Sequence, residues 1–405
     1  MKVFLKTINN YHFLKQPPLK KLIRITTVPM ALRYLLPGQM QFMQQHGFDV
    51  LMISADGPEL NDVIKNEGCR HVIVPMTRKI TPWQDLKCLF QLISVFKKEK
   101  PDIVHTHTPK AGLLGMLAAK LCGVKVRIHT VAGMPLMVEK GFKLKLLTFI
   151  EKLTYWAANH VWPNSGSLYN YITEHRLTTP KKLQIISKGS TNGINLARFN
   201  KEALTSEGIA TIKKQIQFSE NCVYLLCIGR LVADKGIVEL IHVFSNLQQK
   251  FSQLRLVLVG DFEDELDPLP QDVHIQIESN PAVIHITWTQ QVEYFMQVCN
   301  YFIFPSHREG FPNVLLQAGA MQLPIVCSRI AGNVDIVTNN ETGLIFEKGD
   351  EVQMLTQLEY AIKEPGLMTK MAATLYKNVC NDYQRENIWQ NILATYNSLL
   401  NLNNK

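Results

Sequence analysis

The chain has 405 residues, of which 46% are apolar, and this length is enough for about two domains of ~150 residues each. Its 22 glycines and 19 prolines are ordinary for a folded protein, which excludes a disordered or collagen-like chain. Residues 1–200 hold 28 Lys and Arg against 11 Asp and Glu, a net charge of +17, whereas the remainder carries −8, so the first half predicts an anionic partner, either nucleic acid or anionic lipid.

The first twenty residues predict an N-terminal extension. Residues 1–20 contain lysines but are interrupted by Asn9, Asn10 and two prolines, so the apolar centre and cleavage site of a signal peptide are missing. No apolar run in the sequence reaches the ~18 residues that a membrane-spanning helix needs. The eight cysteines include no CxxC pair and mostly lie in apolar runs, which indicates reduced core thiols in a cytosolic protein.

The next 170 residues or so alternate buried strands with helices. The expected strands are residues 22–28, 49–54, 71–74, 103–107, 126–130, 160–164 and 183–186. The expected helices between them include residues 29–46, 83–98 and 108–121. This alternation predicts an α/β domain with a doubly wound parallel sheet, which we place at residues 21–190.

Three histidines lie at the ends of two of these strands. His105, His107 and His129 do not predict a metal site, because they sit on separate strand ends without a nearby carboxylate. His107 and Lys110 lie just past a strand, where ligands collect in sheets of this kind. They are therefore candidate binding residues.

Residues 136–159 predict a basic amphipathic helix. Lysines accompany aromatic and aliphatic residues there, namely Lys140, Lys143, Lys145, Lys152, Phe142, Phe149 and Trp156. Such a helix can lie in a lipid headgroup layer, or it can pack on a sheet with a solvated basic face. Both interpretations stay open, and the positive charge of the first half favours the lipid.

The alternation restarts in the second half. Residues 221–228 predict a strand, residues 229–236 a loop, and residues 237–249 a helix. Arg230 and Lys235 in this loop can converge on one pyrophosphate, because arginine supplies a planar fork and lysine a point charge. A lone basic loop is usually surface charge, so the prediction depends on a second anion-binding element nearby.

The following strands are expected at residues 254–259 and 283–287. Between them lies an acidic loop that we expect to be solvated, because prolines interrupt the backbone and no helical spacing pairs its carboxylates. The loop contains Glu263, Asp264, Glu265 and Asp267.

Residues 301–350 are the stretch around which a site is expected. The apolar run 301–305 predicts a strand buried on both faces, and Pro312 suits the first position of the helix that follows. A helix start at the carboxyl end of a parallel strand binds anions through free amides and the helix dipole. Glu309 and Gln317 would then be free to bind sugar or ribose hydroxyls. The alternative is a surface loop with a solvated glutamate.

The end of the chain predicts three helices, at residues 351–362, 367–379 and 385–400. Residues 190–194 have turn chemistry and predict the crossing between two domains. We therefore expect a second domain at residues 195–384 and a terminal helix at 385–405.

The sequence REGFPNVLLQAGAMQLPIV at 308–326, followed by AGNVDIV and ETGLIF, resembles the signature of the retaining glycosyltransferases of family 4. The resemblance covers nearly the whole chain from residue 21, and it implies the GT-B fold, in which two Rossmann-like domains face each other across a cleft. In that family, two glutamates eight positions apart contact the donor sugar and the ribose. Glu309 matches the first, but the second position is Gln317, an amide that can still bind a diol.

The resemblance implies further roles. His129 matches a histidine that approaches the donor sugar, although a histidine satisfied within the sheet remains the alternative. Trp288 stands where the family usually has glycine in the loop that cups the nucleotide base. The match is weakest at the first loop, where Gly38 replaces a pair of glycines that contacts phosphate.

The expected catalytic residues are Glu309, His129, Arg230 and Lys235. The expected donor-binding residues are Gly38, Gly229, Arg230, Lys235, Thr287, Glu309, Gly310, Phe311, Pro312, Asn313 and Gln317. The residues expected on the acceptor side are His107 and Lys110. No metal or other cofactor is expected, because two cations and a helix dipole can stabilise a departing diphosphate.

The resemblance implies transfer of a sugar, with retention, from a nucleotide diphosphate sugar, UDP-linked in most of the family, to a lipid-linked or oligosaccharide acceptor. Capsule, O-antigen or other surface-polysaccharide assembly is the expected process, on the cytoplasmic face of the inner membrane through peripheral contact with anionic lipid. No nucleic-acid partner is expected, because no such motif appears. Two alternatives stay open: a nucleotide-sugar 2-epimerase of the same fold, and a catalytically silent nucleotide-sugar-binding protein.

Overall fold

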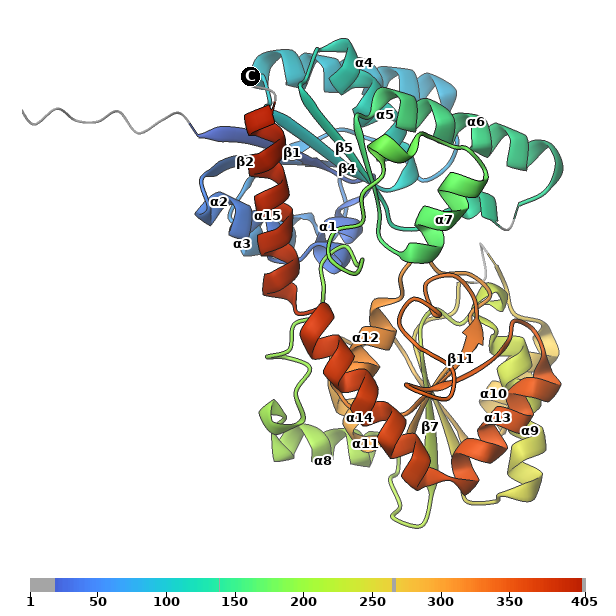
Figure 1. Cartoon of the computed structure of the whole chain (residues 1–405). Helices are drawn as coiled ribbons and strands as arrows, with labels where there is room; N and C mark the ends of the chain where they lie inside the picture. The colour runs from blue at the N-terminus through green and yellow to red at the C-terminus, as the bar shows by residue number, and fades with distance from the viewer. Residues whose placement is uncertain (1–18, 138, 264–266, 403–405) are drawn as a thin grey trace, which may run out of the picture.

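The computed structural model describes residues 19–137, 139–263 and 267–402. The expected N-terminal extension lies almost entirely outside these residues, and so do Asp264, Glu265 and the last three residues. The described chain forms two lobes joined at a narrow waist, each built around a six-stranded parallel sheet (Figure 1).

The first lobe has the strand order β3-β2-β1-β4-β5-β6. Its strands are β1 (Lys20–Ile25), β2 (Phe48–Ser54), β3 (Arg70–Ile73), β4 (Ile103–His107), β5 (Val126–Val131) and β6 (His160–Pro163). β1 pairs in parallel with β2 on one side and with β4 on the other. The order therefore reverses between β1 and β4, and ligands of such sheets bind near the carboxyl ends of the strands at this point.

Helices cover both faces of the first sheet. One face packs against α4 (Pro82–Glu99), α5 (Pro109–Leu121), α6 (Gly141–Ala157) and α7 (Gly166–Glu174). The other packs against α1 (Pro29–Leu35), α2 (Gln39–Gln45), α3 (Leu60–Glu67) and α15 (Arg385–Leu402). Since both faces are covered, the central strands are buried along most of their length, and β4 is buried at every residue although it carries two histidines and a threonine.

The second lobe has the strand order β12-β11-β10-β7-β8-β9. Its strands are β7 (Val223–Ile228), β8 (Leu254–Val259), β9 (Val283–Ile286), β10 (Tyr301–Phe304), β11 (Ile325–Arg329) and β12 (Leu344–Glu347). One face packs against α8 (Ser206–Gln215), α11 (Val292–Val298), α12 (Asn313–Ala320) and α14 (Pro365–Asp382). The other packs against α9 (Ile237–Lys250), α10 (Gln271–Ser279) and α13 (Glu351–Lys363).

Short 3-10 helices complete the described elements. They are η1 (Pro135–Met137), η2 (Pro180–Lys182), η3 (Lys201–Ala203) and η4 (Ala233–Lys235). η1 and η4 lie at the carboxyl ends of β5 and β7, one in each lobe.

Two predicted elements differ in the structure. Residues 29–46 form two helices rather than one, because Pro37 lacks an amide donor and Gly38 has a φ of +82°, which ends α1 before α2 begins. Residues 183–186 make an isolated bridge from Leu183 to Val161 instead of a seventh strand. β6 is therefore an edge of the first sheet.

The C-terminal helix α15 passes from the second lobe to the first (Figure 1). Ile388, Ile392 and Tyr396 join the core of the first lobe. At the waist, the Ile194 amide donates to the Tyr383 carbonyl at 2.8 Å. The chain therefore crosses between the lobes twice along paired backbone segments.

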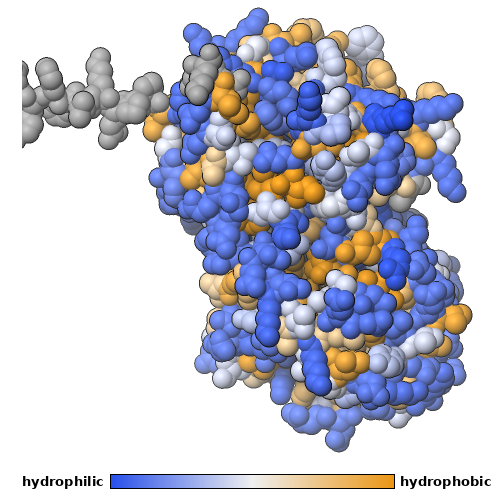
Figure 2. Space-filling model, viewed as in Figure 1, coloured by the Kyte–Doolittle hydropathy of each residue, from blue (hydrophilic) through white to orange (hydrophobic). Residues whose placement is uncertain are grey.

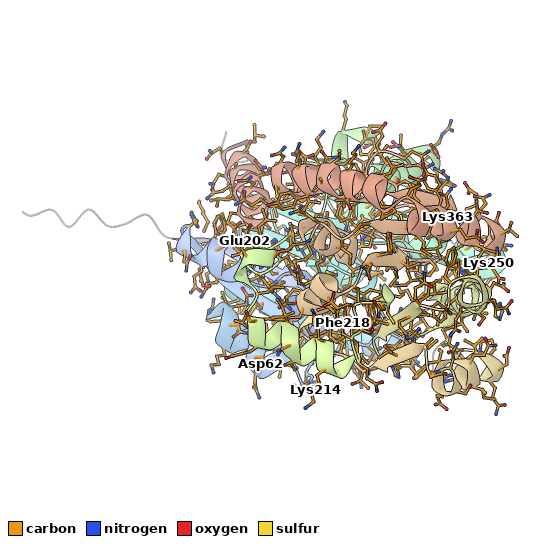
Figure 3. The ribbon with its side chains drawn as sticks, turned by 90° about the horizontal axis from the view of Figure 1, so that it is seen from below. Asp62, Glu202, Lys214, Phe218, Lys250 and Lys363 are labelled. Carbon is orange, nitrogen blue, oxygen red and sulfur yellow. The ribbon has the colours of Figure 1, made fainter. Side chains whose placement is uncertain are left out.

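The face seen in Figure 2 is largely hydrophilic, with hydrophobic patches in both lobes as well as near the waist. Seen from the end of the second lobe, Lys214 points outward, whereas Phe218 packs inward and stacks on Tyr224 with ring centroids 5.1 Å apart (Figure 3).

Candidate functional site

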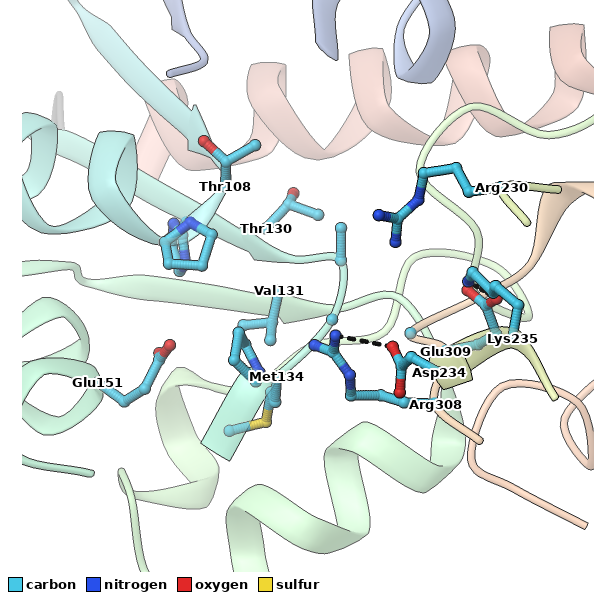
Figure 4. Close-up of a pocket in the computed structure, with 16 residues that line it drawn as sticks. Thr108, Thr130, Val131, Met134, Glu151, Arg230, Asp234, Lys235, Arg308 and Glu309 are labelled. Atoms are coloured by element: carbon cyan, nitrogen blue, oxygen red, sulfur yellow. Dashed lines mark hydrogen bonds and ion pairs between the residues drawn. The ribbon is translucent and has the colours of Figure 1, made fainter. Parts of the chain in front are cut away.

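A cavity of about 290 Å³ lies between the lobes, at the carboxyl ends of both sheets (Figure 4). The first lobe contributes residues that follow β4 and β5 and one residue of α6, and the second lobe contributes the loops after β7 and β10. The lining residues are Thr108, Pro109, His129, Thr130, Val131, Ala132, Gly133, Met134, Pro135, Glu151, Arg230, Asp234, Lys235, Arg308, Glu309 and Gly310. All four predicted catalytic residues are among them.

The loops after β7 and β10 are packed closely together. Gly236, at the end of η4, has a φ of +70°, and an added Cβ there would lie 2.3 Å from the Pro305 carbonyl oxygen, so glycine suits this position. This approach brings Lys235 beside Glu309, and the ammonium group forms an ion pair with the carboxylate. The two side chains are 17% and 18% exposed, so water screens this pair little.

Two acids of the loop after β8, which we expected to be solvated, have partners in the second lobe. Glu263 forms an ion pair with Arg230, and the Asp267 carboxylate accepts a hydrogen bond from the Asp234 amide at 2.7 Å. The prediction was wrong for these two acids because the loop folds back onto the loop after β7, where a guanidinium and an amide bind the carboxylates.

Sequence reasoning missed a second ion pair in the cavity. The Arg308 guanidinium lies 3.0 Å from the Asp234 carboxylate, and both residues line the cavity (Figure 4). Asp234 precedes Lys235 and Arg308 precedes Glu309. Two neighbouring loops with adjacent opposite charges were a signal that could have predicted both pairs.

His129 faces the cavity from the end of β5 and is 3% exposed. Its Nδ1 lies 2.9 Å from the Thr106 hydroxyl oxygen, which leaves Nε2 for a ligand. Burial lowers the pKa of His129 to about 4, so the imidazole is neutral at pH 7. A neutral ring can donate or accept a hydrogen bond but adds no charge to the site.

Gly310 brings the two lobes into contact. An added Cβ at Gly310 would lie 1.7 Å from the Ala132 carbonyl oxygen and 2.6 Å from the Gly133 Cα. Such a distance excludes any side chain at this position while the lobes stay in this arrangement. Gly310 is therefore both a lining residue and the point where the second lobe meets the loop after β5.

Four residues predicted to bind the donor do not line the cavity. Phe311 packs its ring against Tyr383, with centroids 5.6 Å apart, and Pro312 is buried. α12 begins at Asn313 instead of at Pro312. Asn313 and Gln317 are half-buried. Gly310 is therefore the residue near this helix start that lines the cavity.

Gly229 and Thr287 also lie outside the lining. The Gly229 amide donates to the Val259 carbonyl at 3.0 Å, and Thr287 is exposed. The adjoining Trp288 ring lies 6.0 Å from that of Tyr34 in the first lobe, edge to face. The tryptophan that replaces the family's glycine thus contacts the opposite lobe.

Gly38 has no free amide for a phosphate. Its amide donates to the Glu67 carboxylate at 2.6 Å, and the amides of Met40 and Gln41 donate to the same group. The start of α2 is therefore already occupied by an anion of the protein itself. An added Cβ at Gly38 would also meet the Trp389 ring at 2.8 Å.

The two residues expected on the acceptor side do not line the cavity either. His107 is 1% exposed and stacks on His105 with centroids 4.4 Å apart, and burial lowers its pKa well below the usual value. The Lys110 ammonium lies 2.7 Å from the Asp85 carboxylate and also donates to Thr81. Both side chains thus have partners or neighbours within the first lobe that hold them away from the cavity.

α6 packs on the first lobe, as one of the two interpretations of its sequence expects, and its contact with a lipid headgroup layer stays a prediction. Its inner face packs on the lobe through Thr154 and Tyr155, whereas Phe142, Phe149 and Trp156 are 80%, 63% and 57% exposed. Lys143, Lys145 and Lys152 are exposed on the same helix. The helix therefore both packs on the first lobe and presents a basic aromatic surface.

The described residues contain neither a cluster suited to a metal ion nor a helix suited to cross a membrane. No group of three or more His, Cys, Asp and Glu side chains there is arranged to hold a metal ion. Among the helices of residues 19–137, 139–263 and 267–402, none combines the length and the apolar character needed to cross a membrane.

Residues 38–189 match the family described as "Glycosyl transferase 4-like domain", and residues 208–378 match "Glycosyl transferases group 1". The capsular polysaccharide biosynthesis glycosyltransferase CapM of Staphylococcus aureus is 34% identical over 381 residues, which cover 94% of this chain and 98% of CapM. The chain belongs to the group 1 glycosyl transferases. The expected family is thereby confirmed.

This glycosyl transferase is also similar to more distant proteins. The UDP-Gal:alpha-D-GlcNAc-diphosphoundecaprenol alpha-1,3-galactosyltransferase of Escherichia coli is 27% identical over 320 residues, covering 77% of this chain and 79% of the relative. The crystal structure of Anabaena Alr3699/HepE in complex with UDP superimposes with a TM-score of 0.77 at 14% identity, covering 94% of this chain and 100% of that chain. This likeness confirms the predicted GT-B fold.

Proposed function

We propose that this glycosyl transferase moves a sugar from a UDP-linked donor to an undecaprenyl-diphosphate-linked acceptor, with retention at the anomeric carbon, in the assembly of capsule or another surface polysaccharide. The convergence of Arg230, Lys235 and Glu309 in one cavity between the lobes carries the proposal. The names of CapM and of the galactosyltransferase from Escherichia coli support the process and the acceptor class. The UDP in the HepE complex supports the nucleotide.

The donor diphosphate competes with carboxylates for the two cations. Arg230 is paired with Glu263 and Lys235 with Glu309. A diphosphate carries more charge than one carboxylate, so it displaces both pairs when it enters. Glu309 is then released to bind hydroxyls of the donor sugar.

Charge grows on the diphosphate as its bond to the anomeric carbon breaks. Arg230 and Lys235 stabilise this charge in the cavity between the lobes, where Lys235 is 17% exposed. Neutral His129 binds the donor sugar from the first lobe without opposing the two cations. Gly38 and Lys110 have no part in this proposal, because their polar groups have partners elsewhere. His107 has none either, because it is buried and does not line the cavity.

The acceptor lipid is proposed to approach along the first lobe. α4 and α6 flank α5, and α4 adds Trp83 and Phe90, which are 82% and 62% exposed, to the aromatic residues of α6. Exposed aromatic rings enter the headgroup layer, and the lysines of α6 are complementary to anionic lipid. This surface is our proposal for peripheral membrane contact on the cytoplasmic face.

The transfer reaction is tested with radiolabelled UDP-sugars and membranes that contain undecaprenyl-diphosphate-linked sugars. Wild-type protein should move label into the lipid fraction, and Glu309→Gln should lose at least about 100-fold in kcat while keeping its melting temperature. Glu347→Gln, which changes an exposed acid paired with Arg329 in the same lobe, is the control. Donor binding without turnover in the wild type would instead favour a silent binding protein.

The membrane surface is tested by sedimentation with vesicles. The triple variant F142S/F149S/W156S should lose binding to vesicles that contain anionic lipid, and wild-type binding should weaken with added salt. Tyr360→Ser removes an exposed aromatic ring on α13 of the second lobe and should bind like the wild type. Equal binding by the triple variant contradicts the proposal.

A further inference from the structure

Glu151 is an acid in the cavity to which the proposed reaction gives no part. It lies on α6, is 6% exposed, and lines the cavity from the first lobe. Figure 4 shows its carboxyl group pointing from the helix into the pocket, on the side opposite Arg230 and Lys235. Burying an acid costs free energy unless the group is hydrogen-bonded. Its position at the cavity therefore indicates a polar ligand.

The elements packed against α6 surround Glu151 with neutral groups. β5 contributes His129, whose pKa burial lowers to about 4, and α6 itself contributes the Tyr155 phenol. η1 contributes no titratable side chain. Lys152, one residue further along α6, is exposed. The corner of the cavity that contains Glu151 is therefore nearly without charge.

The charged side chains of α5 and of the opposite wall have partners of their own. The pairs are Lys110 with Asp85, Lys120 with the ring of Trp156, Arg230 with Glu263, Lys235 with Glu309, and Arg308 with Asp234. Of the lysines and arginines that the structure describes, none forms an ion pair with Glu151. Burial accordingly raises the pKa of Glu151 to about 7, and a carboxyl group that carries its proton both donates and accepts a hydrogen bond.

We propose that Glu151 selects the donor sugar, because its carboxyl group donates a hydrogen bond to an oxygen of one ring substituent, a hydroxyl or an acetamido group. The inference rests on the donor site proposed above and names a residue that distinguishes one sugar from another there. Glu151 takes up no proton in this role, and no bond forms or breaks at it. The role is therefore compatible with retention at the anomeric carbon.

The geometry of the cavity places the sugar near Glu151. Arg230 and Lys235 belong to the second lobe, so a sugar attached to a diphosphate between them extends toward the first lobe. Tyr155, one turn after Glu151, has its ring centroid 6.1 Å from that of His129. The face of α6 that carries Glu151 thus lies against His129, the other first-lobe residue proposed to bind the sugar.

A buried hydrogen-bonding group discriminates strongly between ligands. A sugar that lacks the matching oxygen leaves the buried carboxyl group without a partner, and this costs more than the loss of the bond in water. A sugar with the oxygen in the other ring configuration meets the same penalty. One carboxyl group at this wall is therefore enough to favour one sugar over its epimer.

Glu151→Met tests this role, because methionine is similar in length but forms no strong hydrogen bond. Isothermal titration calorimetry with UDP and with UDP-glucose, UDP-galactose, UDP-GlcNAc and UDP-GalNAc gives the ratio of the affinity for each UDP-sugar to that for UDP. For the preferred sugar this ratio should fall about 10- to 100-fold in Glu151→Met, while the affinity for UDP stays unchanged. Glu151→Gln keeps an amide donor and should retain most of the ratio. Glu174→Met, the same change at an exposed acid of α7, should bind like the wild type.

Analogues of the preferred sugar that each lack one oxygen substituent locate the contact. One of them should bind the wild type about 10- to 100-fold more weakly than the parent sugar. The same analogue should bind Glu151→Met as tightly as the parent does, because the hydrogen bond is already missing. Equal losses in the two proteins for every analogue would overturn this role of Glu151 and leave the donor site standing. Failure of the wild type to bind any of the four UDP-sugars would refute both.

The pH dependence separates this role from a merely structural one. The carboxyl group donates only while it carries its proton, so the affinity ratio of the wild type should fall as pH rises through about 7. The ratio of Glu151→Gln should not change over this range. The difference between the two proteins is the measurement, because the titration of UDP itself is common to both. A wild-type ratio that stays constant or rises would show that Glu151 does not donate to the sugar.

Discussion

Each cation proposed to bind the donor is already paired with a carboxylate. Lys235 holds Glu309 and Arg230 holds Glu263, so the charge of the site is balanced before any ligand enters. Arg230 is 45% exposed and its pair is weak in water, whereas Lys235 is largely shielded. Lys235 should therefore contribute more to donor affinity than Arg230 does.

Lys235→Met is the variant that measures this contribution. It should weaken UDP binding about 30-fold, which corresponds to roughly 2 kcal/mol for a shielded charge pair. The variant also leaves the Glu309 carboxylate without its cation. Repulsion between this carboxylate and the diphosphate then weakens UDP binding further. Isothermal titration calorimetry with UDP is the measurement, and Lys214→Met, far out on α8, is the control. Equal affinity for UDP in both variants would show that Lys235 does not bind the donor.

The pKa of Glu151 predicts how stability depends on pH. Its pKa is about 7 in the folded chain and near 4.5 in an unfolded one, so the folded state binds the proton more tightly. The stabilisation is fully present below pH 4.5 and is lost as pH rises to 7, by up to roughly 3 kcal/mol. Glu151→Gln cannot titrate, and its unfolding free energy should lack this decline.

Urea denaturation from pH 4.5 to 8 measures the difference between wild type and variant. His129 acts in the opposite direction, since its pKa is about 4 and it destabilises the fold only as pH falls below 6.5. Because His129 is present in both proteins, its contribution cancels in the difference. Parallel curves of unfolding free energy against pH for the two proteins would show that the pKa of Glu151 is not shifted.

At the scale of elements, buried strands were the most predictable part of the chain. β8 occupies the expected residues 254–259, because an apolar run between turn residues leaves few other conformations for a strand covered on both faces. The break between α1 and α2 was missed, although Pro37 and Gly38 mark it. Because the apolar face of the two helices continues across the break, the apolar periodicity alone does not reveal the break.

The candidate site was predictable where it depends on one sheet. Arg230, Lys235 and Glu309 follow neighbouring parallel strands, whose carboxyl ends meet at one edge, so sequence alone brings them together. Glu151 was not predicted, because its place depends on how α6 packs against β5 and faces the other lobe. Gly38 was assigned to the donor from the family resemblance, and the sequence did not reveal that its amide is bound to the Glu67 carboxylate, 29 residues away.

The contact between the β10–α12 loop and the loop after β5 gives a prediction at this scale. Gly310→Ala places a methyl group where the Ala132 carbonyl lies, so the lobes must stay further apart. Each lobe keeps its own core, and the melting temperature should change little. Transfer should fall by at least about 100-fold, because a displacement of about 1 Å costs that much.

Gly366→Ala is the matched control, since an added Cβ there meets no atom within 4 Å. Initial rates at saturating donor and acceptor are the measurement for both variants. Full activity in Gly310→Ala would mean that the reaction does not require the two lobes to be this close together.

At the scale of the whole molecule, a buried polar network ties the C-terminal helix and the crossing segment to the first lobe. We propose to divide the chain into residues 21–190, 195–384 and 385–405, and the network connects the first and the last of these parts to the crossing segment between the lobes. The Arg24 guanidinium in β1 binds the Tyr396 hydroxyl of α15 and the Gln39 side chain of α2. Gln39 in turn donates to Asn192 at 2.9 Å. α15 is thereby tied to the core of the first lobe and to the crossing segment.

Asn192 is the residue on which this network depends. It is 2% exposed, and its Oδ1 accepts from the Trp389 indole at 2.6 Å while its Nδ2 donates to the Pro37 carbonyl at 3.1 Å. Asn192→Ala leaves the Trp389 indole and one of the two N–H groups of the Gln39 amide without an acceptor, at about 1–3 kcal/mol each, while the Gln39 amide keeps its bond to the Thr191 carbonyl. We expect a fall of roughly 2–4 kcal/mol in the free energy of unfolding.

The same substitution should loosen the arrangement of the lobes, because the crossing segment loses its bond to Trp389 of α15 and one of its bonds to Gln39 of α2. The radius of gyration from small-angle X-ray scattering should then rise without ligand and return toward the wild-type value with UDP. UDP affinity should fall, since binding must now restore the closed arrangement. Asn387→Ala, an exposed asparagine on the same helix, should change neither quantity. A variant with wild-type stability and an unchanged radius of gyration would show that the paired backbone at Ile194 and Tyr383 holds the lobes by itself.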